Sequence, residues 1–380
     1  MQELLHALLQ QAVASGASDL HLKAGSYPIV RIHGELAPLT TERRLDSAET
    51  AQIAAALLTP ELRQRFERQR EVDLAYSVPG LGRFRCNVYQ QRGTIGLALR
   101  VIPMRVPTFE ELNLPPVLAK IADEERGLIL VTGTTGSGKS TTLAAMIEHI
   151  NRTAACHIIT IEDPIEYLHR DNRSIINQRE VSVDTTSFAQ ALRAALRQDP
   201  DVILVGEMRD AETMETALAA AETGHLVLST LHTLDATETV NRIIAVFPPH
   251  QQRQVRLQLA SVLRAVISQR LLPRADSRGR VPAVEVLVST PFVRDCIIDK
   301  DRTSQIRDAI AAGTSQYGMQ TFDQSIFGLY QRGLVTLEEA LRWASNVDEF
   351  KLKVQGISTT AELARDEMHR AAPDIIRFGG

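Results

Sequence analysis

Short apolar runs alternate with amphipathic segments through the middle of the chain. The runs are rich in leucine, isoleucine and valine and cover residues 128–131, 158–161, 202–205 and 226–228. Segments with apolar residues at helical spacing lie between them and cover residues 139–151, 187–198 and 211–223. Strands that are buried on both faces carry continuous apolar runs. The alternation therefore predicts an α/β domain with a parallel sheet and right-handed crossovers.

The N-terminal part of the chain has a different pattern. Apolar residues at helical spacing predict helices over residues 1–14 and 47–69. Shorter apolar stretches bounded by glycine and proline predict strands at residues 20–22, 29–32, 72–76, 82–90 and 94–102. These elements together predict one small α+β domain over residues 1–102.

A proline-rich stretch follows this domain. The prolines between residues 103 and 116 restrict the backbone at and before each ring, which predicts a semi-rigid linker over residues 103–116. We expect the second domain over residues 117–345. Beyond residue 235 its pattern is mostly helical and predicts a long helix at 250–272, a strand at 281–288, and helices at 291–299, 302–312, 321–331 and 336–345. Residues 346–380 have weaker periodicity, and we expect them to form a tail.

Composition and charge narrow the class of protein. Hydrophobic residues make up 44% and charged residues 23% of the chain, as in soluble globular proteins. A net charge of −4 argues against a nucleic-acid partner, because proteins that bind nucleic acids carry a basic surface patch. The three cysteines are far apart, which suits a reducing cytoplasm and excludes a C-x-x-C zinc site. The N-terminus lacks the features of a signal peptide, and no apolar run reaches the ~18 residues of a membrane-spanning helix, so we expect membrane association only through a partner.

Residues 133–140 read GTTGSGKS and fit the phosphate-loop pattern G-x-x-x-x-G-K-S/T. An apolar strand precedes them and a helix follows, which is the context that the pattern requires; a glycine-rich turn before an ordinary helix is the alternative. Glycines let backbone N–H groups surround the β-phosphate, and the helix N-terminus favours negative charge. We expect Lys139 to reach the β- and γ-phosphates of ATP and the Ser140 hydroxyl to bind Mg²⁺. The predicted nucleotide-binding residues are Gly133, Thr134, Thr135, Gly136, Ser137, Gly138, Lys139, Ser140 and Thr141.

Acidic residues follow two of the predicted strands. Residues 162–166, which include Glu166, come directly after the run at 158–161, and Glu207 comes just after the run at 202–205. A parallel sheet places its ligand-binding groups at the carboxyl ends of its strands. A carboxylate there can bind Mg²⁺ through water or polarise the attacking water. The alternative is that either group caps a helix.

Two histidines flank the next predicted strand. His225 precedes the run at 226–228, and His232 follows it. Single histidines near strands are commonly structural, but this segment comes one helix after the acidic strand. We therefore expect the two histidines to sense the γ-phosphate. We do not expect these two histidines to bind a metal ion, because no third ligand lies near them in the sequence.

Four of these segments, in this order, resemble the Walker A, Asp box, Walker B and His box of the secretion ATPases of the GspE/PulE type. They are GTTGSGKS at 133–140, EDPIE at 162–166, LVGEMRD at 204–210 and TGHLVLSTLHT at 223–233. GASDLHL at 16–22, GRFR at 82–85 and YGMQTFD at 317–323 are also similar to this family. Within it, the chain most resembles the retraction ATPases of the type IV pilus, over about residues 1–345.

The resemblance implies a fold and an assembly. The fold is a PAS-like N-terminal α+β domain followed by a RecA-like ATPase domain with a helical C-terminal part. The assembly is a homohexamer, with ATP bound between the two domains of each subunit. Hydrolysis would rotate one domain against the other about the linker. The hexamer would act in the cytoplasm on an inner-membrane platform protein of the pilus machinery, without inserting into the membrane itself.

The resemblance also assigns roles to residues. Glu166 is then the catalytic glutamate, and Glu207 is the Walker B acid that acts on Mg²⁺ or on water. His225 and His232 are the His-box pair. Three arginines of the N-terminal domain are expected to approach the phosphates, where a guanidinium can neutralise charge that develops on the γ-phosphate; a basic strand face on the surface is the alternative. These arginines are Arg83, Arg85 and Arg100.

Retraction and extension ATPases of this family differ in two features. The extension type carries an additional N-terminal domain and usually a four-cysteine zinc motif. This chain begins in the smaller N-terminal domain and has no cysteine between residues 269 and 280, which favours the retraction type. The segment at 291–300 departs from the AIRNLIRE-like sequence that is usual in retraction ATPases, and keeps Arg294 and the apolar spacing.

Other functions remain open at this stage. An extension, secretion or DNA-translocating ATPase would use the same fold, although the missing cysteines speak against the extension type and the acidic charge against the DNA-translocating type. A nucleotide-dependent regulatory or scaffold subunit with little turnover belongs to a different class. Intact Lys139, Glu166 and Glu207 speak against that alternative.

Overall fold

The computed structural model describes residues 2–32, 34–40, 43–277 and 279–356. The chain forms two compact units. The first consists of Met1–Arg105 together with Pro164–His169, and the second of Val106–Asp163 and Arg170–Gly380. The segment that was expected to be a linker is therefore divided at Arg105, and its larger part belongs to the second unit.

The first unit contains a six-stranded antiparallel sheet with strand order β3-β2-β1-β6-β5-β4. Its strands are β1 (Asp19–Lys23), β2 (Ile29–Ile32), β3 (Glu35–Pro38), β4 (Glu71–Val78), β5 (Gly82–Gln91) and β6 (Thr94–Ile102). Its helices are α1 (Gln2–Ala14), α2 (Ser47–Leu57) and α3 (Pro60–Gln69). Alternate residues of the central strands, such as Phe84, Cys86 and Val88, are fully buried and share one core with α1 and α2. This unit confirms the predicted small α+β fold.

The helix that was predicted over residues 47–69 is wrong in one respect, because it is two helices. Leu58 has an extended backbone and ends α2. The Thr59 hydroxyl accepts a hydrogen bond from the Leu62 N–H and caps α3, in which Pro60 takes the first position. Proline fits the first turn of a helix but lacks the N–H that a helix interior needs. The interruption therefore follows from Pro60.

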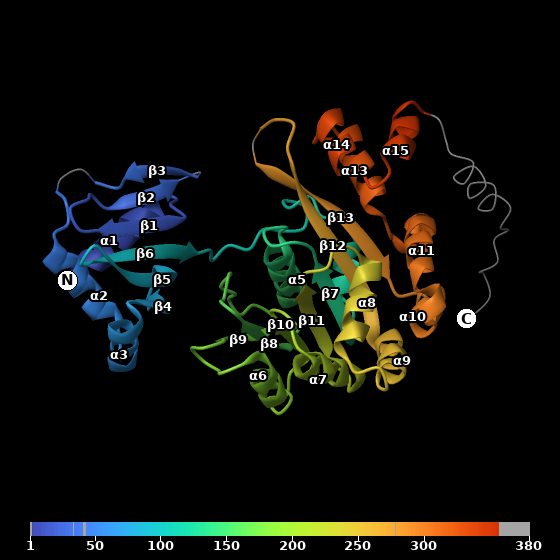
Figure 1. The fold of residues 1–380 in the computed structure, drawn as a ribbon, viewed down its shortest axis with the longest axis horizontal. Coiled ribbons are helices and arrows are strands. Elements are labelled where there is room, and N and C mark those ends of the chain that lie inside the picture. Colours follow the sequence, from blue (N-terminus) through green and yellow to red (C-terminus); the bar gives the residue numbers. More distant parts are fainter. Residues whose placement is uncertain (1, 33, 41–42, 278, 357–380) are drawn as a thin grey trace. The chain divides into compact units, whose positions relative to one another are not determined.

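The second unit contains a seven-stranded sheet with strand order β13-β12-β7-β11-β10-β8-β9 (Figure 1). All neighbours pair in parallel except β12 and β13, which form an antiparallel hairpin. The strands are β7 (Gly127–Thr132), β8 (His157–Glu162), β9 (Ile175–Glu180), β10 (Val202–Val205), β11 (Leu226–Leu231), β12 (Leu263–Pro273) and β13 (Arg280–Val288). Every residue of β7, β10 and β11 is buried, as the continuous apolar runs predicted.

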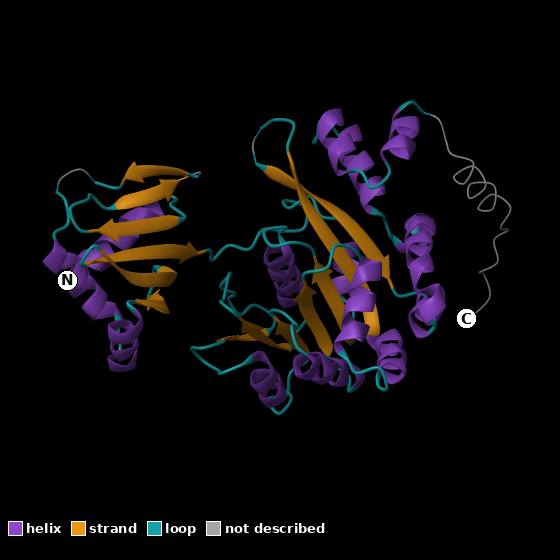
Figure 2. Ribbon diagram, in the orientation of Figure 1, coloured by secondary structure: helices purple, strands orange, loops and turns teal. Residues whose placement is uncertain are grey.

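Helices cover both faces of this sheet (Figure 2). On one face lie α4 (Val117–Ala122) and α5 (Lys139–Thr153), and α5 packs on β7 and β11. Leu128, Leu130 and Ile203 face the other side, where they share a core with residues of the opposite helix layer. That layer consists of α6 (Phe188–Ala195), α7 (Ala211–Glu222), α8 (Ala236–Val246), α9 (Gln252–Val262) and α10 (Pro291–Ile298). Helices on both faces of a parallel sheet are the arrangement that the alternating pattern predicted.

The long helix that was predicted over residues 250–272 is wrong in its second half. The helix α9 ends at Val262, and residues 263–273 form β12 between β7 and β13. The five consecutive residues Ala265–Gln269 are buried on this strand. A short apolar run does not distinguish a buried helix from a buried strand, and here pairing with β7 decides in favour of the strand.

The C-terminal part of the second unit is helical. After α10 come η1 (Lys300–Gln305), α11 (Ile306–Ala312), α12 (Thr314–Tyr317), α13 (Phe322–Gln331), α14 (Leu337–Trp343) and α15 (Val347–Val354). Phe350 of α15 is buried against α13, so the predicted tail begins with a packed helix. Residues 357–380 lie outside the described residues. Among the residues that the structure describes, no helix is long and apolar enough to span a bilayer.

Candidate nucleotide-binding site

The segment at 133–140 forms a tight loop between β7 and α5. Gly133 has a φ of +136°, and a Cβ atom there would lie 2.5 Å from the Gln269 carbonyl oxygen and 2.6 Å from the Ser137 hydroxyl oxygen. Gly138, with a φ of +95°, forms the N-cap of α5. Both positions therefore require glycine, the first because of space and backbone angle and the second because of backbone angle.

The N-terminus of α5 points into this loop and no side chain caps it. Lys139 is buried, and its ammonium group donates hydrogen bonds of 2.9 and 3.0 Å to the carbonyl oxygens of Gly133 and Thr134. The Ser137 hydroxyl is also buried and, within the described part of the chain, has no hydrogen-bond partner. The N-terminus of α5 without a side-chain cap, the buried Lys139 ammonium and the Ser137 hydroxyl together form a site that fits a phosphate chain. The binding of ATP and Mg²⁺ by the residues named for it in the sequence stays a prediction.

Glu207 lies beyond the end of β10, beside the end of β11. Its carboxylate is largely buried, and one oxygen pairs with Nε of Arg209 at 2.5 Å. The other oxygen lies 3.4 Å from Nε2 of His232, which follows β11 directly. The backbone is fixed nearby, since the Thr230 hydroxyl donates a 2.7 Å hydrogen bond to the Gly206 carbonyl. Because β11 is paired in register with β7, this group lies at the same edge of the sheet as the phosphate loop.

The acidic segment after β8 is divided between the two compact units. Glu162 ends β8, and its carboxylate accepts hydrogen bonds from Thr160 and Gln178 at 2.6 and 3.1 Å. The exposed Glu166, by contrast, belongs to the Pro164–His169 segment of the first unit. Two carboxylates of the same motif thus belong to different compact units, and the catalytic role expected of Glu166 stays a prediction.

The structure places His225 and His232 at opposite ends of the same strand. His225 precedes β11, whereas His232 follows it, so the six-residue strand separates them by about 20 Å. His225 Nδ1 lies 2.9 Å from the carbonyl oxygen of Ala220 near the end of α7, which is a structural contact. His232 therefore lies at the edge of the sheet that carries the phosphate loop and His225 at the opposite edge, and the nucleotide-sensing role expected of the two histidines stays a prediction.

The three predicted arginines share one face of the sheet in the first unit. Arg85 and Arg100 lie directly opposite each other on β5 and β6. Arg100 also donates a 2.8 Å hydrogen bond to Asp19. Burial opposes ionisation of Asp19, but the hydrogen bonds from Arg100 and Ser18 outweigh it and lower the pKa of this carboxyl. An acidic partner for one of the arginines was not predicted, and the approach of all three to the phosphates stays a prediction.

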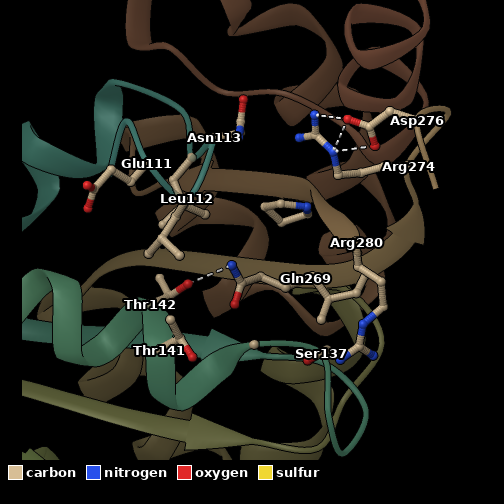
Figure 3. A pocket seen from close by; sticks show the side chains of 14 residues that line it. Glu111, Leu112, Asn113, Ser137, Thr141, Thr142, Gln269, Arg274, Asp276 and Arg280 are labelled. Carbon is tan, nitrogen blue, oxygen red and sulfur yellow. Dashed lines mark hydrogen bonds and ion pairs between the residues drawn. The ribbon is translucent and has the colours of Figure 1, made fainter. Parts of the chain in front are cut away.

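A pocket of about 540 Å³ adjoins the phosphate loop (Figure 3). Segment 111–114, the first turn of α5 and the β12–β13 hairpin line it. Gln269 is 2% exposed; its Nε2 donates a 2.8 Å hydrogen bond to the Thr142 hydroxyl, and its Oε1 is buried without a partner among the described residues. Arg280 lines the same pocket. The sequence did not indicate either residue. It predicts a helix around Gln269, and it offers no neighbouring strand for the one predicted at 281–288, so the hairpin could not be foreseen.

Comparisons with known proteins agree with this geometry. Residues 1–372 match the family described as "Type II/IV secretion system protein". The type IV pilus retraction ATPase PilT of Pseudomonas aeruginosa is 45% identical over 343 residues, which cover 90% of this chain and 98% of that protein. The type IV pilus ATPase PilU of the same organism is 42% identical and is covered to 90% of its length.

A solved structure is also similar. The pilus retraction motor PilT with bound ADP superposes with a TM-score of 0.81 at 48% identity, covering 90% of this chain and 97% of that one. The matched 90% of this chain is more than either compact unit contains by itself, so the likeness reaches into both.

Proposed function

The chain belongs to the Type II/IV secretion system protein family and is an ATPase of the PilT type, and from this premise we propose that it is the motor that retracts a type IV pilus. The single observation that supports retraction most is the 45% identity to PilT, which extends over nearly the whole of that protein. The β12–β13 hairpin, which contains no cysteine, is consistent with this choice.

The phosphate loop supplies the binding energy for the nucleotide. The N–H groups at the start of α5 would hold the β-phosphate, and the Lys139 ammonium would exchange its two carbonyl partners for phosphate oxygens. Ser140 and, directly or through water, Glu207 would hold Mg²⁺, which would neutralise charge on the β- and γ-phosphates. The pocket beside Gln269 gives the rest of the nucleotide a place next to the loop.

Hydrolysis needs a water molecule that is oriented toward the γ-phosphate. We assign this task to Glu166, with Glu207 and His232 as the polar groups at the edge of the sheet where the phosphate ends. Arg83, Arg85 and Arg100 would stabilise the charge that develops in the transition state. Binding and release of the γ-phosphate would change the contacts of the two units differently and so drive their relative motion.

The motor would be a ring of six identical chains. It would work in the cytoplasm against an inner-membrane platform protein of the pilus, as a peripheral protein. Size-exclusion chromatography with light scattering on the full chain should give a species of six subunits with ATP, and a persistent monomer under these conditions would speak against a ring.

The direction of the motor is tested by deleting the gene and complementing it with the wild type or with Lys139→Ala. Retraction predicts cells with many surface pili and no twitching, restored by the wild type and not by the variant. Cells without pili would instead indicate extension. The direction needs this test, because PilU, a type IV pilus ATPase whose name states no direction, is almost as similar to this chain as PilT.

A further inference from the structure

The loop that carries His232 is short and is held at several points. It joins the end of β11 to the start of α8. Two of its hydrogen bonds are to α8 itself: the Thr233 hydroxyl pairs with that of Thr239 at 2.6 Å, and the Leu234 N–H donates to Glu238 at 2.7 Å. These contacts fix the loop on its own helix, but they do not fix the helix on the sheet.

A contact of a different kind comes from β13. The Ala236 N–H, at the first position of α8, donates a 3.0 Å hydrogen bond to Oε1 of Glu285. Glu285 is 6% exposed and lies on β13, in the hairpin against which α8 packs (Figure 1). A carboxylate at a helix N-terminus is favoured by the helix dipole. Glu285 therefore ties the start of α8, and with it the His232 loop, to the sheet.

The surroundings of Glu285 are unusual for a purely structural residue. Burial raises its pKa to about 7, and the nearby Asp235 acts in the same direction. The Ala236 N–H and the guanidinium groups of Arg270 and Arg307 act in the opposite direction. A buried carboxylate is costly to keep, and an apolar residue of similar size is often no less stable. Glu285 is therefore better explained by the hydrogen bond that it accepts from α8 than by a gain in stability from its burial.

The same position connects the loop to the phosphate site. Glu285 lies directly opposite Ser268 in the β12–β13 hairpin, and the Ser268 hydroxyl accepts a 2.9 Å hydrogen bond from Thr132. Thr132 immediately precedes Gly133 of the phosphate loop. A continuous series of contacts thus runs from the phosphate loop through Ser268 and Glu285 to the loop of His232.

We propose that Glu285 is a positioning residue for ATP hydrolysis, which holds His232 in register with Glu207 by anchoring the start of α8 to β13. The proposal rests on the proposed function, in which His232 acts at the γ-phosphate. Glu285 itself touches no reacting atom, so its removal should lower kcat and leave KM for ATP nearly unchanged, because the phosphate loop that binds ATP is not altered.

The test compares Glu285→Met with Glu285→Gln in the full chain. Methionine keeps the shape of the side chain but removes the acceptor of the Ala236 N–H, and glutamine keeps an acceptor oxygen in the same place. We expect kcat to fall by about 10-fold or more for Glu285→Met, because small displacements of an active group are costly, and to recover for Glu285→Gln. Asn151→Leu is the matched control, since Asn151 is also buried and bonds a loop, at the far end of α5.

A double-mutant cycle shows whether Glu285 acts through His232. If it does, adding Glu285→Met to His232→Ala should change kcat by less than about two-fold. Three results would overturn the proposal. They are losses of kcat that multiply in the double variant, a Glu285→Met variant in which only KM for ATP rises, and a loss of kcat in Asn151→Leu equal to that in Glu285→Met. A wild-type chain without ATP turnover would remove the proposed function and this inference with it, whereas an active wild type with an equally active Glu285→Met would remove the inference alone.

Discussion

Nε2 of His232 lies 3.4 Å from a carboxylate oxygen of Glu207, although the two residues are 25 positions apart in the sequence. Parallel pairing of β10 and β11 brings them together, because each residue follows the end of its strand. The contact places an imidazole and a carboxylate at the edge of the sheet where the phosphate loop begins.

Alanine substitutions of His225 and His232 should have very different effects on kcat. His232→Ala should lower kcat for ATP hydrolysis by about 10²-fold, as the loss of one group that stabilises the transition state does. His225→Ala should keep kcat within about two-fold of the wild type, because His225 contacts Ala220 at the opposite end of β11. Steady-state phosphate release from the two purified variants measures both values.

Equal losses in the two histidine variants would contradict this assignment. They would mean that His225 of one chain acts on a nucleotide held elsewhere, or that both variants are misfolded. Thermal melts of the two proteins separate these explanations, since a folded His225→Ala variant with low kcat could not be explained by its own phosphate loop.

Alanine substitutions of Gly133 and Gly136 should weaken nucleotide binding to different extents, although both residues lie in the phosphate loop. Alanine at Gly133 would clash with the Gln269 carbonyl oxygen and should distort the loop, whereas a Cβ at Gly136 meets no atom within 4 Å. Each change carries a backbone cost of roughly 1–3 kcal/mol from the positive φ. We therefore expect Gly133→Ala to weaken binding of a fluorescent ATP analogue by at least about 10-fold more than Gly136→Ala does.

The converse order of affinities would show that the cramped space at Gly133 does not matter for binding. Equal affinities would assign the need for glycine in this loop to backbone angle alone. A fluorescence titration of both variants at the same Mg²⁺ concentration decides between these outcomes.

Glu285 should give the folded protein a distinctive pH dependence. Its pKa is raised from 4.5 to about 7, so the folded chain holds this proton more tightly than the unfolded chain. The stabilisation is complete below the lower value and is lost as the pH rises through the higher one. We expect the Tm of the wild type to fall relative to that of Glu285→Gln between about pH 5 and about pH 8.

A Tm difference between these two proteins that stays constant over that range would contradict the raised pKa. If the Tm of the wild type instead rises with pH relative to that of Glu285→Gln, the pKa of Glu285 is lowered in the folded chain and not raised. Because the comparison is between two proteins that differ at one position, the titration of other carboxylates cancels to first order.

The sequence was sufficient to predict the elements whose patterns are local. Strands such as β7 and β10 are apolar over their whole length, and the loop at 133–140 has a spacing that few other structures share. The order of acidic and histidine segments also located the edge of the sheet that carries Glu207 and His232.

Features set by long-range pairing were beyond sequence reasoning. The apolar run of Ala265–Ile267 suits a helix as well as a strand, and only pairing with β7 makes it a strand. Gln269 reaches the phosphate loop for that reason alone. The distance between His225 and His232 likewise depends on whether the residues between them form a strand, and β11 does so here.

The same limit applies to Glu285. Its neighbours in the sequence are apolar, and nothing in the local pattern distinguishes it from a strand residue that faces solvent. Its importance lies in a hydrogen bond to a helix 49 positions away. Such contacts become visible only when β13 is placed beside α8.

The most direct test of the account is steady-state phosphate release by the purified full chain and by Lys139→Ala, with Mg²⁺ and ATP. Lys139 is the one residue of the loop whose ammonium group is poised to reach the phosphates. We expect clear turnover by the wild type and a background rate for a folded Lys139→Ala. Equal turnover by the two proteins, or none by the wild type, would contradict it.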